Sequence, residues 1–333
     1  MPRVSVLLPV RDAATTLGPC LESLLGQSLH DLEVIAVDDG SRDGSGSLLE
    51  ERSLADPRLV VLRTPPRGIV AALNTALAAA RAPLVARMDA DDLAHPERLA
   101  RQVARLLGDP RVDVLGCRVE LFGEPIREGM RAYVEWLNGL LDHEAIARDL
   151  FVESPLAHPS VALRTESLRG LGGWRAFDGP EDYDLWLRAF EAGLRFAKLP
   201  ETLLAWRDVP GRLTRTDPRY APERFRALKL ETLLRGPLAG ARPAVVWGAG
   251  PIGKGWALAL RGAGRVVRAF VEVDQRKIGG TIHGAPVVAA GRAGDFPGAL
   301  HLAAVGQPGA RERIREEAAR RGLVDGRDLV AVA

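Results

Sequence analysis

Residues 83–92 read PLVARMDADD, an apolar run that ends in three aspartates within four positions. The run is typical of a buried β-strand, and the aspartates at its end have two interpretations. Strand-end turns favour aspartate on their own account, and a divalent cation is the alternative. Like charges this close together raise one another's pKa and destabilise a fold unless something neutralises them. The stretch therefore predicts a strand that brings concentrated negative charge to one edge of a sheet.

The chain on either side of this stretch alternates between continuous apolar runs and segments whose apolar residues recur at helical spacing. Buried strands are expected at residues 4–10, 32–37, 58–62, 83–88 and 112–116. Helices are expected between them, at residues 15–25, 44–54, 69–80 and from near Pro96. Strands that alternate with helices predict parallel βαβ units, so the expected fold class is α/β with a doubly wound, mostly parallel sheet.

A second pair of carboxylates, Asp38 and Asp39, follows the second expected strand, as Asp89, Asp91 and Asp92 follow the fourth. In open α/β sheets, ligands bind beyond the carboxyl ends of the strands. The two acidic clusters should therefore face one crevice. An Asp-x-Asp sequence in such a crevice suits Mg²⁺ or Mn²⁺, hard cations that take a few protein carboxylates and complete their shell with water and substrate phosphates.

The composition narrows the class of protein. The chain has 333 residues, which favours two domains, and its net charge of +2 provides no broad positive field for nucleic acid. Its two cysteines, Cys20 and Cys117, form no metal or disulfide motif, which favours small buried residues in a reducing cytosol. No signal peptide or transmembrane segment is expected. We therefore expect a cytoplasmic protein, with peripheral contact at the inner face of the membrane left open.

A third acidic group, Glu181 to Asp184, follows Pro180 at the start of an expected helix. The helix dipole favours acidic residues in a first turn, by about 0.3 to 1 kcal/mol each, so residue type alone favours a structural role. The functional alternative is a general base that removes a proton from an attacking hydroxyl. The helix N-terminus would keep such a carboxylate ionised, as a base requires.

Beyond about residue 120 the alternation weakens, and residues 132–150 are expected to be helical but mixed in character. It resumes after residues 235–243, RGPLAGARP, which have the composition of a linker. The expected domains are therefore residues 1–234 and residues 244–333.

The second domain opens with a strand and then Gly248, Gly250 and Gly253 in the G-x-G-x-x-G spacing of a dinucleotide fingerprint. Glu272 falls at the end of the next strand, where a ribose partner belongs. The segment AFVEVDQRKIGGTIHGAPVV resembles small Rossmann-like domains found beside sugar-modifying enzymes. We interpret this part as a Rossmann-like accessory domain, and two roles stay open: it binds a nucleotide or nucleotide sugar, or it only packs and dimerises.

Five segments of the chain together resemble one family. They are VSVLLPVRD, IAVDDGSRDGS, ARMDADD with HPERL after it, HPSVALR, and GGWRAFDGPEDYDLWLRA. In this order, over about residues 2–215, the chain is similar to the family 2 glycosyltransferases, whose fold is the nucleotide-sugar-binding type called GT-A. The resemblance implies metal-dependent, inverting transfer of a sugar from a nucleoside diphosphate sugar to a hydroxyl acceptor. The resemblance also implies a role in the assembly of a cell-envelope polysaccharide or glycolipid, where members of this family commonly act.

The resemblance also implies roles for residues on the donor side. Pro9 and Asp39 line the nucleoside pocket, and Asp38 supports them. Asp89 meets the ribose or the metal, and Asp91 is the principal metal ligand.

Further roles are implied around the sugar. Asp182 is the catalytic base, with Glu181 as its neighbour or substitute. Gly68 and Asn74 match the family's helix after the third strand and are assigned to donor binding.

Three further residues have competing interpretations. His158 is either an acceptor-side residue or a structural loop histidine. Trp174 is favoured as a core residue over a floor for the sugar or acceptor. Asp92 is favoured as a cap of the following helix over a further ligand.

Two positions depart from the family pattern. Leu73 stands where many members have arginine, so Arg67 or Arg87 is expected to supply charge to the diphosphate instead. Val209 stands where many members have a histidine that contacts the metal, and Asp208 is the suggested replacement.

Two functions of other classes compete with sugar transfer. A non-catalytic nucleotide-sugar binding protein would bind a donor without turnover. An NAD-dependent oxidoreductase whose chemistry takes place in the C-terminal domain would need a catalytic His or Lys beside residues 248–253. The sequence offers no convincing candidate for that residue.

Overall fold

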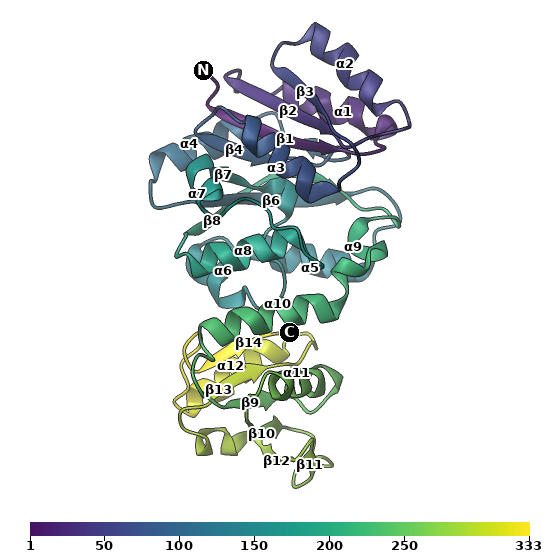
Figure 1. Cartoon of the computed structure of the whole chain (residues 1–333). Coiled ribbons are helices and arrows are strands. Elements are labelled where there is room, and N and C mark those ends of the chain that lie inside the picture. Colours follow the sequence, from purple (N-terminus) through teal and green to yellow (C-terminus); the bar gives the residue numbers. More distant parts are fainter. The chain divides into compact units, whose positions relative to one another are not determined.

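The apolar run at residues 4–10 forms strand β1 (Val4–Val10), which lies between two parallel partners, β2 (Leu32–Asp38) and β4 (Leu84–Arg87). The computed structural model describes residues 1–333 (Figure 1). Every residue of β2 and β4 is buried, and β1 is buried except for the partly exposed Pro9. Near-continuous burial is expected for parallel strands that are covered on both faces.

The sheet that contains these strands has the order β3-β2-β1-β4-β7-β6-β8-β5. Its other members are β3 (Leu59–Arg63), β5 (Leu93–Ala94), β6 (Val114–Phe122), β7 (Ala162–Arg164) and β8 (Phe196–Arg207). Strand β7 runs antiparallel to β4 and β6, and β5 antiparallel to β8, whereas the other pairs are parallel. The predicted α/β class with a mostly parallel sheet is therefore confirmed, although neither the strand β5 nor the direction of β7 was predicted.

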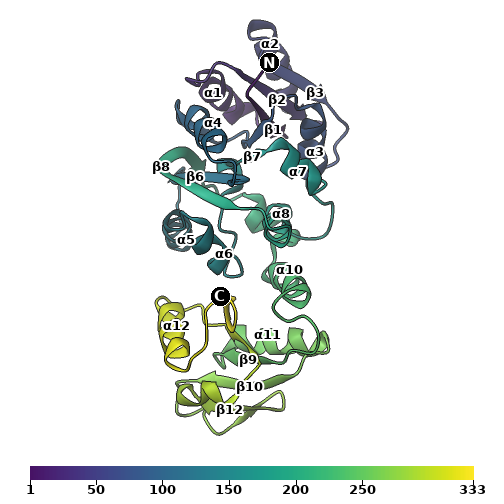
Figure 2. The same cartoon turned by 90° about the vertical axis from the view of Figure 1, so that its left-hand side faces the viewer.

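Helices cover both faces of this sheet. They are α1 (Ala14–Leu25), α2 (Ser45–Ala55), α3 (Ile69–Ala79), α4 (Arg98–Gly108), α5 (Glu128–Gly139), α6 (His143–Asp149), α7 (Thr165–Gly170), α8 (Glu181–Glu191) and α9 (Leu213–Thr216), with 3₁₀ turns η1 (His158–Ser160) and η2 (Pro218–Tyr220). Figures 1 and 2 both place α4 on one side of β8 and α5 and α8 on the other. No helix of the protein is both long enough and apolar enough to span a membrane. Both cysteines are free and buried, as predicted.

Two helices, α5 and α6, occupy most of residues 132–150, which were expected to be helical. Helix α5 ends at Gly139, and Asp142 then starts α6: its carboxylate accepts a hydrogen bond from the N–H of Ala145 (2.8 Å) and its carbonyl one from Ile146. A side chain that caps the first turn in this way favours a new helix start over continuation.

The chain divides into two compact units. The first unit comprises residues 1–146 and 155–220, and the second comprises residues 147–154 and 221–333. The sequence suggests a change of domain at residues 235–243, whereas in the structure α10 (Pro222–Arg235) already belongs to the second unit.

The second unit has its own sheet, in the order β11-β12-β10-β9-β13-β14. Its elements are β9 (Ala244–Trp247), α11 (Pro251–Gly262), β10 (Val267–Glu272), β11 (Thr281–Ile282), β12 (Ala285–Ala289), η3 (Ala290–Asp295), β13 (Leu300–Ala303), α12 (Ala310–Arg320) and β14 (Leu329–Ala331). All its strand pairs are parallel except β11 with β12. A second α/β unit was predicted here, without the short hairpin β11–β12.

The glycine-rich loop between β9 and α11 is a close approach of backbone to backbone. Gly248 has a φ of 97°, and a Cβ on Gly253 would lie 1.9 Å from the carbonyl oxygen of Gly248. Only glycine fits at Gly253, because the first turn of α11 packs directly on the loop. Part of the G-x-G-x-x-G spacing therefore has a purely structural explanation.

We predict that Gly253→Ala lowers the free energy of unfolding by about 2 kcal/mol or more, because the added methyl group must push the helix off the loop. Gly262→Ala, in the same helix, is the matched control, since nothing lies within 4 Å of its added Cβ. It should be neutral or stabilising by up to about 1 kcal/mol. Urea unfolding followed by circular dichroism measures both, and equal stabilities would contradict the close approach.

Candidate functional site

Three neighbouring strands of the first sheet end at one edge and deliver the acidic residues there. Val10, the last residue of β1, pairs with Asp38, and the N–H of Asp39 donates to the carbonyl of Val10 (2.9 Å). On the other side of β1, Leu7 pairs with Arg87, the last residue of β4. The Asp38–Asp39 pair and the aspartates after β4 therefore emerge on either side of β1, at the same edge of the sheet, as the sequence predicts.

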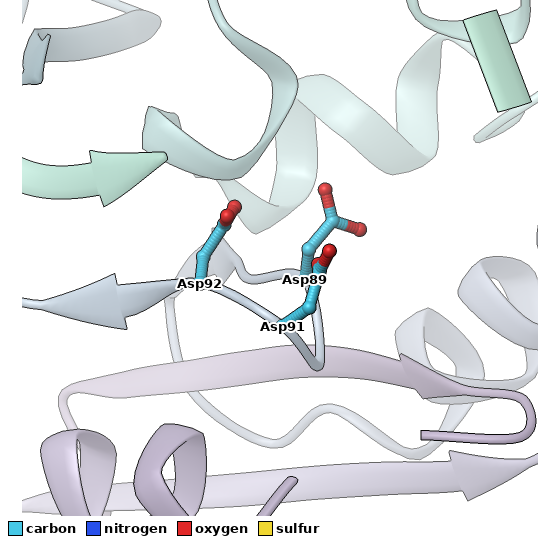
Figure 3. Close-up of side chains that lie close together, drawn as sticks. All are labelled: Asp89, Asp91 and Asp92. Carbon is cyan, nitrogen blue, oxygen red and sulfur yellow. The ribbon is translucent and has the colours of Figure 1, made fainter. Parts of the chain in front are cut away.

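The aspartates after β4 form a compact cluster. Figure 3 shows Asp89, Asp91 and Asp92 on one turn, with their carboxyl groups on the same side. One oxygen from each lies within 4.8 Å of the others. Burial and the charge of Asp89 raise the pKa of Asp91 to about 6, and burial together with Asp89 and Asp91 raises the pKa of Asp92.

This cluster fits a divalent cation. Asp92 is 1% exposed, and its Oδ2 has no hydrogen-bond partner. A buried carboxylate oxygen without a partner is costly, and a cation among three carboxylates would satisfy it. Carboxylate oxygens are also the ligands that Mg²⁺ and Mn²⁺ prefer.

Arg87 is the buried counter-ion of the cluster. Its side chain is 3% exposed and forms an ion pair with Asp89. Burial opposes its charge, but the carboxylates of Asp89, Asp92 and Glu181 together outweigh burial and raise the pKa of Arg87. Its Nε has no hydrogen-bond acceptor. The guanidinium thus neutralises part of the charge that the aspartates bring together, and it links their turn electrostatically to the start of α8.

Asp92 does not cap helix α4, so that interpretation was wrong. The helix begins only at Arg98, and no side chain caps it. The Oδ1 of Asp92 instead accepts a hydrogen bond from the N–H of Arg207 (2.7 Å), and the Nε of Arg207 donates to the carbonyl of Asp91 (2.8 Å). The end of β8 is therefore fastened to the acidic turn by two hydrogen bonds.

Asp208 does not join the aspartate cluster. It is wholly buried and pairs with Arg215 (2.8 Å) and Arg212 (3.5 Å). The guanidinium of Arg212 lies over the ring of Trp206, 4.3 Å from its centre. The suggested replacement of the family's histidine by Asp208 is therefore not what the structure contains.

Asp39 holds the turn before α3. Its Oδ1 accepts a hydrogen bond from the N–H of Arg67 (2.7 Å) and its Oδ2 one from Gly68 (2.8 Å). Gly68 has a φ of 86° and immediately precedes the helix. Asp38 is also buried, and its Oδ1 accepts a hydrogen bond from the N–H of Ser41 (2.9 Å). Both carboxylates thus shape the loops beside β1, close to the partly exposed Pro9.

Asn74 fastens the loop that carries Trp174. Its Nδ2 donates to the carbonyl of Trp174 (2.7 Å), and its Oδ1 accepts from the N–H of the same residue (3.0 Å). Trp174 is 2% exposed, and its indole N–H donates to the Nε2 of His158 (3.1 Å). Trp174 therefore lies in the core, as its favoured interpretation predicted, and these contacts use Asn74 as a structural clamp.

The three carboxylates in the first turn of α8 differ in their burial and in their partners. Asp184 is buried and pairs with Arg188 (2.7 Å). Glu181 is buried, accepts a hydrogen bond from the hydroxyl of Tyr220 (2.7 Å), and has its Oε1 4.0 Å from the Nδ1 of His158. Asp182 is the partly exposed member of the three. Of these carboxylates, Asp182 is thus the one that an incoming hydroxyl could reach.

Tyr220 was missed by sequence reasoning. It lies 39 residues beyond Glu181, and no local pattern connects the two positions. Burial and the charge of Glu181 raise the pKa of Tyr220, so the hydroxyl stays protonated and donates to the carboxylate.

In the second unit, the side chain of Glu272 binds the backbone of the glycine-rich loop. Its Oε2 accepts a hydrogen bond from the N–H of Ala249 (3.0 Å), and Lys277 pairs with the same oxygen (3.3 Å). Burial opposes its charge, but the hydrogen bonds from Ala249 and the residues after Glu272 outweigh burial and lower the pKa of Glu272. The N–H of Ala249, in the loop between Gly248 and Gly250, is thus already bonded within the protein.

Comparisons with known proteins agree with this architecture. The family described as Glycosyl transferase family 2 matches residues 5–171, about half of the chain. The chain is 32% identical over 212 residues to the putative glycosyltransferase EpsE of Bacillus subtilis (strain 168), covering 62% of this chain and 73% of EpsE. It is 30% identical over 203 residues to the amylovoran biosynthesis glycosyltransferase AmsE of Erwinia amylovora, covering 60% and 74%.

Two solved structures share the fold of the chain. S. aureus TarS 1-349 in complex with UDP-GlcNAc superposes with a TM-score of 0.57 at 20% identity, covering 70% of this chain and 67% of TarS. The mannosyltransferase PcManGT from Pyrobaculum calidifontis, in complex with GDP-Man and Mn²⁺, superposes with a TM-score of 0.51 at 24% identity, covering 71% and 63%. At these identities the likeness concerns the fold alone.

The acidic cluster generates a prediction about stability. The pKa of Asp91 is raised to about 6, so ionisation of Asp91 costs stability as the pH rises from about 4 to above 6. In the absence of metal, Asp91→Asn should therefore be more stable than the wild type at pH 7.5, by on the order of 2 kcal/mol. The difference should shrink as the pH is lowered towards 4.

Urea unfolding in EDTA measures this effect, and a repeat in Mn²⁺ is the control. Mn²⁺ should stabilise the wild type more than Asp91→Asn, because the variant lacks the proposed principal metal ligand. A variant that is less stable than the wild type at every pH would mean that Asp91 is a structural group and not an electrostatic burden.

Proposed function

The chain belongs to glycosyl transferase family 2, and from this membership we propose that it is a metal-dependent, inverting enzyme. It moves a sugar from a nucleoside diphosphate sugar to a hydroxyl acceptor. The observation that carries the proposal is the compact cluster of Asp89, Asp91 and Asp92 at the sheet edge, with the unpartnered Oδ2 of Asp92 among its oxygens. The partly exposed Asp182 at the start of α8 adds a candidate base.

The cation is proposed to bind Asp91 and Asp89, with the unpartnered oxygen of Asp92 beside them. When bound, Mg²⁺ or Mn²⁺ would neutralise the negative charge that develops on the departing diphosphate. Arg87 forms an ion pair with Asp89 and places a positive charge beside the cluster. The nucleoside is proposed to lie along Pro9 and Asp39, on the other side of β1.

Transfer with inversion needs one proton acceptor and no enzyme nucleophile. The acceptor oxygen forms a bond to the anomeric carbon while the bond from that carbon to the diphosphate oxygen breaks. The proton of the acceptor hydroxyl passes to the carboxylate of Asp182, which we assign as the general base. Its exposure supports this choice over Glu181 and Asp184, which are buried and bonded to Tyr220 and Arg188.

Donor and pathway are proposed by analogy. TarS and PcManGT bind UDP-GlcNAc and GDP-Man, so a UDP- or GDP-sugar is the first choice of donor. The name of AmsE refers to amylovoran biosynthesis, which favours a polysaccharide or glycolipid of the cell envelope as acceptor. We place the enzyme in the cytoplasm or at the inner face of the membrane, in line with its two free, buried cysteines.

The second unit is proposed to be an accessory module. A nucleotide at Gly248, Gly250 and Gly253 would need the backbone N–H groups of the loop, and Glu272 already binds that of Ala249. This contact favours a packing role for the glycines over nucleotide binding.

The proposal predicts donor hydrolysis that depends on the cluster and on the base. A panel of UDP- and GDP-sugars with Mn²⁺, assayed for released nucleoside diphosphate, should identify one donor. Asp91→Ala should abolish release, and Asp182→Asn should lower kcat about 10²- to 10⁴-fold while donor binding persists. Asp31→Asn, an exposed aspartate next to the amino end of β2, is the matched control and should be fully active.

The outcomes separate the competing functions. A wild type that binds a donor tightly but never releases nucleoside diphosphate, even with a panel of glycans and glycolipids, would establish the non-catalytic binding protein instead. NMR of the product should give the anomeric configuration opposite to that of the donor, and retention would overturn the single displacement.

A further inference from the structure

Glu181 is held by two side chains that come from distant parts of the chain. Tyr220 donates its hydroxyl hydrogen to Oε2 (2.7 Å), and the Nδ1 of His158 lies 4.0 Å from Oε1. His158 accepts the indole N–H of Trp174 at Nε2, so its single ring proton lies on Nδ1, the nitrogen that faces the carboxylate. Burial and the charge of Arg87 lower the pKa of His158, which keeps the ring neutral in this tautomer.

These contacts leave Glu181 in a poor position to accept a substrate proton. The residue is 3% exposed, and both of its oxygens face donors of the protein itself. Asp182 follows it directly in the first turn of α8. Anything that fixes Glu181 therefore fixes the backbone from which Asp182 projects.

We propose that Glu181 is a positioning residue, which Tyr220 and His158 lock in place, and that it fixes the backbone from which Asp182 projects. This inference rests on the proposed function, because it takes Asp182 as the base.

The first test removes one hydroxyl group. Tyr220→Phe leaves Oε2 of Glu181 without its donor, so kcat should fall about tenfold or more while KM for the donor stays within about twofold. Tyr133→Phe is the matched control, because the ring of Tyr133 packs on Trp136 and Trp206, whereas the hydroxyl that Glu181 accepts is that of Tyr220. Unchanged kcat in a folded Tyr220→Phe would overturn the proposal.

The second test separates positioning from proton transfer. Glu181→Gln keeps an oxygen that accepts the hydrogen bond of Tyr220, so it should retain most of the activity and the acid limb of the wild-type pH–rate profile. Asp182→Asn should lose both. A Glu181→Gln variant as inactive as Asp182→Asn would identify Glu181 as the base and overturn its positioning role.

The third test needs no turnover. Hydrogen exchange measured by mass spectrometry on the full chain should be faster in peptides from residues 155–160 and 181–191 in Tyr220→Phe than in Tyr133→Phe. The measurement decides the positioning claim even for a wild type without transfer activity, which would by itself contradict only the proposed function. Unchanged exchange in both peptides would overturn the positioning claim.

Discussion

The charge of three neighbouring aspartates is the constraint on which the site depends. Asp89, Asp91 and Asp92 stand on one turn, and the buried guanidinium of Arg87 pairs with Asp89. Burial and the charge of Asp89 raise the pKa of Asp91 to about 6, and an oxygen of Asp92 stays without a partner. The fold thus keeps excess negative charge at the sheet edge, which a bound divalent cation would neutralise.

Much of this arrangement could be predicted because it follows from local pattern. Apolar runs fixed the strands β1, β2 and β4, and parallel strands necessarily bring the residues after β2 and β4 to the same edge. The position of Asp182 in the first turn of a helix could also be predicted from the local sequence. The contacts that could not be predicted join distant residues: Tyr220 lies 39 positions from Glu181, and Arg207 lies 115 positions from Asp92. Periodicity carries no signal for such pairs, which is why Asp92 was mistaken for a helix cap.

The glycine-rich motif of the second unit and the acidic motif of the first unit differ in whether their polar groups already have partners within the protein. In the second unit, Glu272 bonds the N–H of Ala249, and Gly253 is explained by its approach to Gly248, so the fingerprint is internally satisfied. In the first unit, the aspartate turn keeps an unsatisfied oxygen. A sequence motif records only residue types, whereas the partners of those residues decide whether a ligand is needed.

The central claim is that aspartates from two strands converge to hold a cation and a nucleoside diphosphate. Anomalous diffraction at the manganese edge, from crystals grown with Mn²⁺ and UDP or GDP, tests it most directly. The account predicts one peak within coordination distance, about 2 Å, of an Asp91 oxygen, with the nucleoside against Asp39. No peak at residues 89–92, or a nucleotide bound only at residues 248–253, would contradict it.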